Sequence, residues 1–163
     1  MLRLAVDLVP RTAWWSNVRS HVTSAEWELC KEYSKSLTDG VCYICGDTSR
    51  NQGRKYDTEA HEIWEYDDDN RIQTLVDIVP LCVRCHQCKH WGRTSLVMKE
   101  RYLQVLRRHW MTLNQWNRTQ LNMYLDVESK VWAMRSSVEW TLDLSRLEQI
   151  LGKPVEVRRK KIA

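Results

Sequence analysis

Four cysteines occur in two pairs whose spacing suits metal binding. Cys42 and Cys45 form one Cys-x-x-Cys pair, and Cys82 and Cys85 form a second. Each pair can present two thiolates from a tight turn, and two pairs complete the tetrahedral four-sulfur shell that zinc prefers in structural sites. The stretch between the pairs is longer than in a simple zinc ribbon, so a hairpin must bring them together. The pattern predicts a structural Zn²⁺ that contributes folding free energy.

Three histidines near the second pair indicate a metal site of a different kind. His86 and His90 are four residues apart in "CHQCKH", so on a helix they share one face. Cys88 is rotated by roughly 200° from each of them and is expected to be a packed thiol. His61, in "EAHEIW", folds back over this helix if the chain forms a strand, a strand and then the helix. Three imidazoles leave open coordination positions, which distinguishes a catalytic metal site from a closed structural one.

These segments resemble the HNH endonucleases, a family with a ββα-metal fold, in those members that also carry a structural zinc. The resemblance covers residues 42 to about 91 and rests on "CYIC", "EAHEI", "DIVPLC" and "LCVRCHQCKH", in the order of the family. It implies a metal-dependent endonuclease that hydrolyses phosphodiester bonds, with DNA as the expected substrate and RNA as the alternative. It also implies one catalytic divalent metal, for which imidazole ligands favour Zn, Ni, Co or Mn over Mg.

By position, the resemblance makes His61, His86 and His90 the ligands of the catalytic metal. Two positions depart from the family pattern. Glu62 stands where the family has the histidine that deprotonates the attacking water, and Asp77 stands where it has the asparagine that holds the catalytic loop. The candidate catalytic residues are therefore Glu62, His61 and Asp77.

The identity of the general base stays open at this point. A carboxylate beside a divalent cation stays ionised at neutral pH and can act as a base, although it is weaker than imidazole. On a regular strand His61 and Glu62 point to opposite faces, so both reach one phosphate only where the backbone bulges or ends. Otherwise Glu59, on the same face as His61, is the closer carboxylate. A shifted alignment would make His61 itself the base and leave Glu62 as a solvated strand residue.

Basic and aromatic residues around this region are candidate contacts to nucleic acid. The basic ones nearest to the proposed site are Arg84, Lys89, Arg93, Arg54 and Lys55. Phosphate contacts of this kind would depend on salt and be largely independent of sequence. A solvated surface position is the alternative for each of them. Trp64 and Trp91 flank the site and suit either core packing or base stacking.

The elements that must position these residues follow from capping signals, turns and hydrophobic spacing. Residues 4–9 predict a short strand, and Thr23 with Glu26 predicts a capping box for a helix over 24–37. Two β-rich segments joined by "DDDN" predict a hairpin. A short helix is expected from residue 83 to Gly92. Beyond it, apolar residues three and four apart predict helices on both sides of "NQWN", then a short helix "SRLEQIL" and a basic tail.

Length and composition favour a single α+β domain with appendages. The 163 residues are 43% hydrophobic and 28% charged with a net charge of +4, and no apolar run reaches the length of a membrane span. We divide the chain into an N-terminal segment with a helix (1–40), the zinc-stabilised ββα core (41–93) and a helical region with a basic tail (94–163). Asp7 interrupts the apolar N-terminus, so we expect no signal peptide and a reducing, cytoplasmic setting.

Two other functions are compatible with the same residues. A module that keeps the zinc-stabilised fold without catalysis could bind nucleic acid or a protein partner. The departures at Glu62 and Asp77 favour this alternative, whereas the retention of three imidazoles argues against it. In a third possibility, a small inhibitor or adaptor, the C-terminal helices carry the function. The sequence predicts no oligomeric state.

Overall fold

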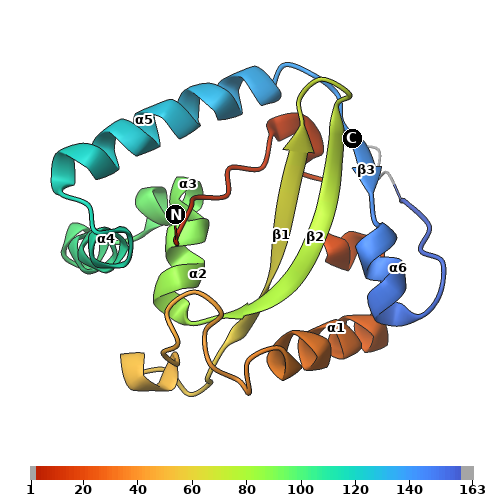
Figure 1. Cartoon of the computed structure of the whole chain (residues 1–163), viewed down its shortest axis with the longest axis horizontal. Coiled ribbons are helices and arrows are strands. Elements are labelled where there is room, and N and C mark those ends of the chain that lie inside the picture. Colours follow the sequence, from red (N-terminus) through yellow and green to blue (C-terminus); the bar gives the residue numbers. More distant parts are fainter. Residues whose placement is uncertain (1–2, 159–163) are drawn as a thin grey trace.

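A long antiparallel hairpin forms the centre of the fold (Figure 1). In the computed structural model, which describes residues 3–158, β1 (Glu59–Asp67) pairs with β2 (Ile72–Leu81). The register is regular through Ile63 and shifts between Ile63 and Trp64, where Val76 is the extra residue of β2. A short strand, β3 (Thr141–Asp143), runs parallel to β2 in the order β1-β2-β3. Strand β1 therefore lies at the edge of the sheet.

Helices pack on both sides of the hairpin (Figure 1). On one side lie α1 (Ser24–Ser36) and α6 (Ser145–Leu151). On the other side lie α2 (Val83–Lys89), α3 (Trp91–Val97), α4 (Glu100–Asn114) and α5 (Arg118–Arg135). Each side has its own apolar cluster. Short 3-10 turns occur at η1 (Arg11–Ala13), η2 (Val18–Ser20) and η3 (Arg50–Gln52). The result is an α+β fold with two apolar layers.

The N-terminal segment crosses the molecule between the hairpin and the second group of helices (Figure 1). The strand predicted for residues 4–9 was wrong, because the backbone groups here find other partners. The N–H of Val6 donates to the hydroxyl of Tyr124 (2.9 Å), and the N–H of Asp7 donates to the carbonyl oxygen of Lys89 (2.8 Å). We call residues 3–9 the N-terminal strap, since α2 and α5 hold it in place.

Most of the other predicted elements are confirmed. Thr23 and Glu26 form the capping box of α1, and the hairpin and α6 occur where the sequence predicts them. The short helix after the second cysteine pair ends at Lys89, and Gly92 falls inside α3, so the predicted end at Gly92 was wrong. Strand β3 was not predicted, because three residues are too few to show a periodic pattern.

Residues from all three predicted segments share one apolar cluster. Leu4, Cys82 and Leu106 are buried together in the layer beneath α2 to α5. Of the basic tail, residues 159–163 lie outside the part of the chain that the structure describes. Within residues 3–158, no helix combines the length and the apolar character needed to cross a membrane.

Candidate metal centres

The four paired cysteines converge on one point. The sulfur atoms of Cys42, Cys45, Cys82 and Cys85 all lie within 4.8 Å of one another, and those of Cys45 and Cys82 are 3.6 Å apart. Zn–S bonds of about 2.3 Å in a tetrahedron place the sulfurs about 3.8 Å apart. Three of the four side chains are buried. The cluster could therefore hold a structural metal ion, and its donor set fits the predicted Zn²⁺.

Local turns shape each cysteine pair. The N–H of Gly46 donates to the carbonyl oxygen of Cys42 (2.8 Å), and Gly46 takes a φ of 73°, a left-handed conformation that favours glycine. In the second pair, Cys82 is the N-cap of α2. The hairpin returns the second turn to the first, where the N–H of Tyr43 donates to the carbonyl oxygen of Pro80 (2.8 Å).

A histidine of α4 also contacts this cluster. The Nε2 atom of His109 lies 3.1 Å from the sulfur of Cys85. No short spacing in the sequence connects His109 with the cysteines, since Cys85 lies 24 positions before it. Only the packing of α4 against α2 brings it to the sulfurs.

His61, His86 and His90 form a second cluster. One ring nitrogen of each lies within 4.8 Å of those of the other two, and the Nε2 atoms of His86 and His90 are 3.1 Å apart. His61 comes from β1, whereas His86 lies in α2 and His90 is its C-cap. Among residues 3–158 this group contains no carboxylate. Three imidazole nitrogens suit a transition metal such as zinc.

Carboxylates contact one ring nitrogen of two of these histidines. Asp7 Oδ2 lies 2.6 Å from His61 Nε2, and Glu59 Oε2 lies 2.7 Å from His86 Nδ1. The ammonium group of Lys89 donates to the other oxygen of Asp7 (3.2 Å). Carboxylate–histidine pairs of this kind fix the tautomer and orientation of a ring and make its remaining nitrogen a better metal ligand. In His86 the nitrogen left for a metal is Nε2.

Burial and hydrogen bonding set the charges around the histidines. Burial lowers the pKa of His61, and desolvation by the neighbouring groups together with the charges of His61 and His86 lowers the pKa of His90, although its side chain reaches solvent. The hydrogen bond with His86 lowers the pKa of Glu59. Burial alone would raise the pKa of Asp7, but the hydrogen bond with His61 and a nearby lysine outweigh it and lower this pKa. Neutral His61 and His90 are the forms that bind a metal.

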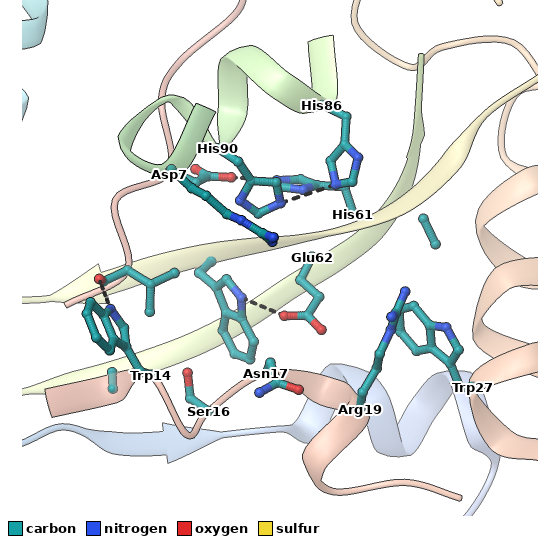
Figure 2. Close-up of a pocket in the computed structure, with 15 residues that line it drawn as sticks. Asp7, Trp14, Ser16, Asn17, Arg19, Trp27, His61, Glu62, His86 and His90 are labelled. Carbon is teal, nitrogen blue, oxygen red and sulfur yellow. Dashed lines mark hydrogen bonds and ion pairs between the residues drawn. The ribbon is translucent and has the colours of Figure 1, made fainter. Parts of the chain in front are cut away.

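A cavity of about 640 Å³ lies beside the three histidines (Figure 2). Figure 2 shows His61, His86 and His90 on one side of β1 and Glu62 on the other. Because β1 is the edge strand, the cavity passes its free edge and is lined from both faces. The labelled residues that surround the half with Glu62 are Trp14, Ser16, Asn17, Arg19 and Trp27.

Glu62 enters this cavity from the face opposite to His61. Its carboxylate accepts hydrogen bonds from the N–H of Val18 (2.8 Å) and from the indole N–H of Trp64 (3.2 Å). Burial raises the pKa of Glu62 to about 7. The bulge comes after His61 and Glu62, which both pair regularly with β2, so it does not turn them to the same face.

Asp77 is not brought to the cavity. Its carboxylate accepts hydrogen bonds from the hydroxyl of Tyr33 (2.9 Å) and from Nε of Arg146 (3.3 Å). These contacts join β2 to α1 and α6, away from the histidines. Asp77 is therefore outside the residues that line the cavity, and a catalytic role for it stays a prediction.

One of the five basic residues predicted to contact nucleic acid lines the cavity. That residue is Arg93. Lys89 is only 7% exposed and pairs with Asp7, so a phosphate contact by Lys89 is corrected to an internal ion pair. Arg54 and Lys55 are exposed in the loop before β1, and Arg84 is half-buried on α2, all outside the residues that line the cavity.

Comparisons with models of protein families, with curated proteins and with solved structures find no match for this chain. Its two side-chain clusters and the cavity are therefore the basis for inferring what it does. The two clusters could hold metal ions in two chemically distinct settings.

Sequence reasoning missed what the N-terminal residues contribute to the cavity. Asp7, Trp14 and Arg19 all line it. One signal was available for Asp7, which is a lone charge in an apolar run and needs a partner when it is buried. No local pattern identifies Trp14 or Arg19, because their place depends on how the segment folds across the edge of β1.

Proposed function

We propose that this protein is a metal-dependent endonuclease of the HNH type that hydrolyses phosphodiester bonds in DNA. One observation carries the proposal. Three imidazoles from β1 and α2 lie together at the wall of a cavity that also contains two arginines. An open metal site beside positive charge can polarise a phosphodiester and stabilise the charge that develops during its hydrolysis.

The three histidines would hold the catalytic metal, with Asp7 and Glu59 keeping two of the rings in place. Three nitrogen ligands leave coordination positions for water and a phosphate oxygen. When bound, the divalent ion supplies Lewis-acid chemistry that polarises the phosphate and stabilises the leaving oxygen. The imidazole donors favour Zn, Ni, Co or Mn over Mg.

Arg19 and Arg93 would bind the phosphates of the substrate. Both line the cavity, and within residues 3–158 neither forms an ion pair with a carboxylate. A guanidinium group presents several N–H donors in a plane that matches two phosphate oxygens. A DNA strand that passes the free edge of β1 would therefore meet positively charged side chains beside the metal site.

Glu62 is our candidate for the general base. It lines the same cavity as His61, and its two N–H donors fix the direction of its carboxylate. Glu59 already accepts a hydrogen bond from the ring of His86, which suits a positioning role. Because Glu62 lies across the strand edge from the histidines, it would take a proton from a water held between the two halves of the cavity.

Nicking of supercoiled plasmid by the purified protein tests the proposal. We expect nicking that requires a divalent metal from a panel of Zn, Mn, Ni, Co and Mg and that disappears in His86→Ala. The circular dichroism of this variant should match wild type, and it should retain the zinc bound at the four cysteines, because the sulfur cluster is intact. Cleavage at the wild-type rate by His86→Ala would contradict the proposal.

The variant Glu62→Gln tests the general base. It removes the proton acceptor and keeps the shape of the side chain, so we expect cleavage to slow by about 10²- to 10⁴-fold. The matched control is Glu65→Gln, which changes an exposed residue of the same strand that does not line the cavity. An unchanged rate in Glu62→Gln would exclude Glu62 as the base.

A binding module without catalysis is the second candidate function. Two features of Glu62 favour this candidate. Glu62 stands where the HNH family has the histidine that acts as the base, and its side chain lies across β1 from His61. Zinc-containing protein that binds DNA but cleaves it with none of the metals would select this alternative.

A further inference from the structure

The half of the cavity across β1 from the histidines has walls that suit a flat aromatic ligand. Trp14, Trp27 and Trp64 line it, and we call these three residues the tryptophan wall. Trp14 is 63% exposed, although its indole N–H donates to the carbonyl oxygen of Val9 (3.1 Å). This hydrogen bond holds the ring in place without burying it. A large, oriented and exposed indole beside a candidate metal site points to a ligand that stacks on it.

Positive charge accompanies these rings. The guanidinium carbon of Arg19 lies 4.6 Å from the ring centroid of Trp27, and the side chain of Asn17 is exposed nearby. Figure 2 shows Trp14 and Trp27 at opposite ends of this half of the cavity, with Asn17 and Glu62 between them. Aromatic platforms next to a cationic group are the recurring composition of sites for single-stranded nucleic acid.

The carboxylates of the cavity do not repel such a ligand strongly, because both are already paired. Asp7 contacts His61 and Lys89, and Glu62 accepts two N–H donors. The cationic side chains face the cavity from both sides of β1, Arg93 near the histidines and Arg19 near the tryptophans. The charge therefore suits a phosphate on the histidine side and an adjoining group on the tryptophan side.

We propose that the tryptophan wall binds an unpaired nucleobase next to the phosphate at the histidines. The substrate is then a single strand, or a nucleotide extruded from a duplex. This inference rests on the proposed nuclease function and names its substrate class. A cavity of about 640 Å³ is large enough for one nucleotide, since small-molecule sites span about 300–1,000 Å³. A paired base is stacked inside the duplex and must leave it to enter such a cavity.

Equilibrium binding of oligonucleotides to the full chain tests the inference. Fluorescence anisotropy compares a fluorescein-labelled single DNA strand with the same sequence as a duplex, with zinc retained by the protein and no other divalent metal added. A gel confirms that the DNA remains intact. We expect tighter binding of the single strand, and a loss of about 5- to 150-fold in Trp14→Ala, the usual effect of removing one stacking partner.

Two further variants separate stacking from a general structural effect. Trp14→Tyr keeps an aromatic ring and should retain most of the single-strand affinity. Tyr43→Ala removes an aromatic side chain that is 61% exposed, close to the exposure of Trp14, but lies outside the cavity, and should bind as wild type does. A single 2-aminopurine in the strand should be quenched on binding to wild type and not to Trp14→Ala, which reports stacking directly.

Several results would overturn the inference. One is that wild type and Trp14→Ala bind the single strand with equal affinity, and another is that both bind the duplex more tightly than the single strand. The inference also fails if Tyr43→Ala loses as much single-strand affinity as Trp14→Ala, or if the protein binds neither form of DNA. The nuclease proposal is decided separately, by plasmid nicking in wild type against His86→Ala. Active enzyme with an unchanged Trp14→Ala variant would therefore remove the base-binding role alone.

Discussion

The cysteine cluster and the histidine cluster share helix α2, but the chain builds them in opposite ways. Two local turns supply the four sulfurs, which lie mostly buried and form a complete set of ligands. A strand and a helix end supply the three imidazoles, which lie beside a cavity. A closed shell of four sulfurs suits a structural ion, whereas three imidazoles leave room for a reacting group.

The two clusters also depend differently on the rest of the chain. The sulfurs come from two turns and the hairpin that joins them, with one further contact from His109 of α4. The histidines additionally depend on Asp7, which the N-terminal strap carries to His61 and which is held there through Val6 and Tyr124 of α5. The C-terminal helices thus reach the histidine cluster through the strap, without contributing a ligand.

Removing a sulfur should have the largest effect. We expect Cys42→Ser to lose its zinc and unfold, because structural zinc contributes about 10–16 kcal/mol in model peptides and whole domains are stable by only about 5–15 kcal/mol. Zinc content and thermal unfolding followed by circular dichroism measure this. The control Cys88→Ala changes a buried thiol of α2 that lies outside the cluster, and this variant should keep its zinc. If Cys42→Ser stays folded without zinc at the cysteines, the cysteine cluster is not needed for folding, and its contrast with the histidine cluster as the structural site is lost.

Asp7→Asn should have a smaller, two-part effect. It weakens the hold on His61 and leaves the buried ammonium of Lys89 without its partner charge. We expect a loss of about 3 kcal/mol in the free energy of unfolding and a 10- to 100-fold weaker metal affinity at the histidines, with zinc at the sulfurs unchanged. Chemical denaturation and calorimetric titration with Co²⁺ measure these two quantities. If neither changes, the strap does not support the histidine cluster.

Glu59→Gln should separate metal affinity from stability. The side chain of Glu59 is 41% exposed, so its ion pair with His86 contributes less than about 1 kcal/mol to the free energy of unfolding. The same change removes the charge that orients the ring, so we expect metal affinity to fall by about 10- to 100-fold. Calorimetric titration against Glu65→Gln measures the difference. Unchanged metal affinity would show that Glu59 does not position His86.

The sequence by itself determined the features that rest on contacts between near neighbours. The cysteine pairs, the capping box of Thr23 and Glu26, and the hairpin with the helix after it all depend on spacings of a few residues. The order of these elements was enough to expect His61 to meet the histidines of α2, because a hairpin followed by a helix has few ways to fold back on itself.

Only the tertiary structure decided what surrounds the histidines. Asp7 lies 54 positions before His61 in the chain, and no spacing rule connects them. The edge position of β1 lets Glu62 share a cavity with His61 from the opposite face, while packing of α1 and α6 draws Asp77 away. These placements follow from burying apolar surface across the whole chain, a driving force that is not directional and leaves no local pattern in the sequence.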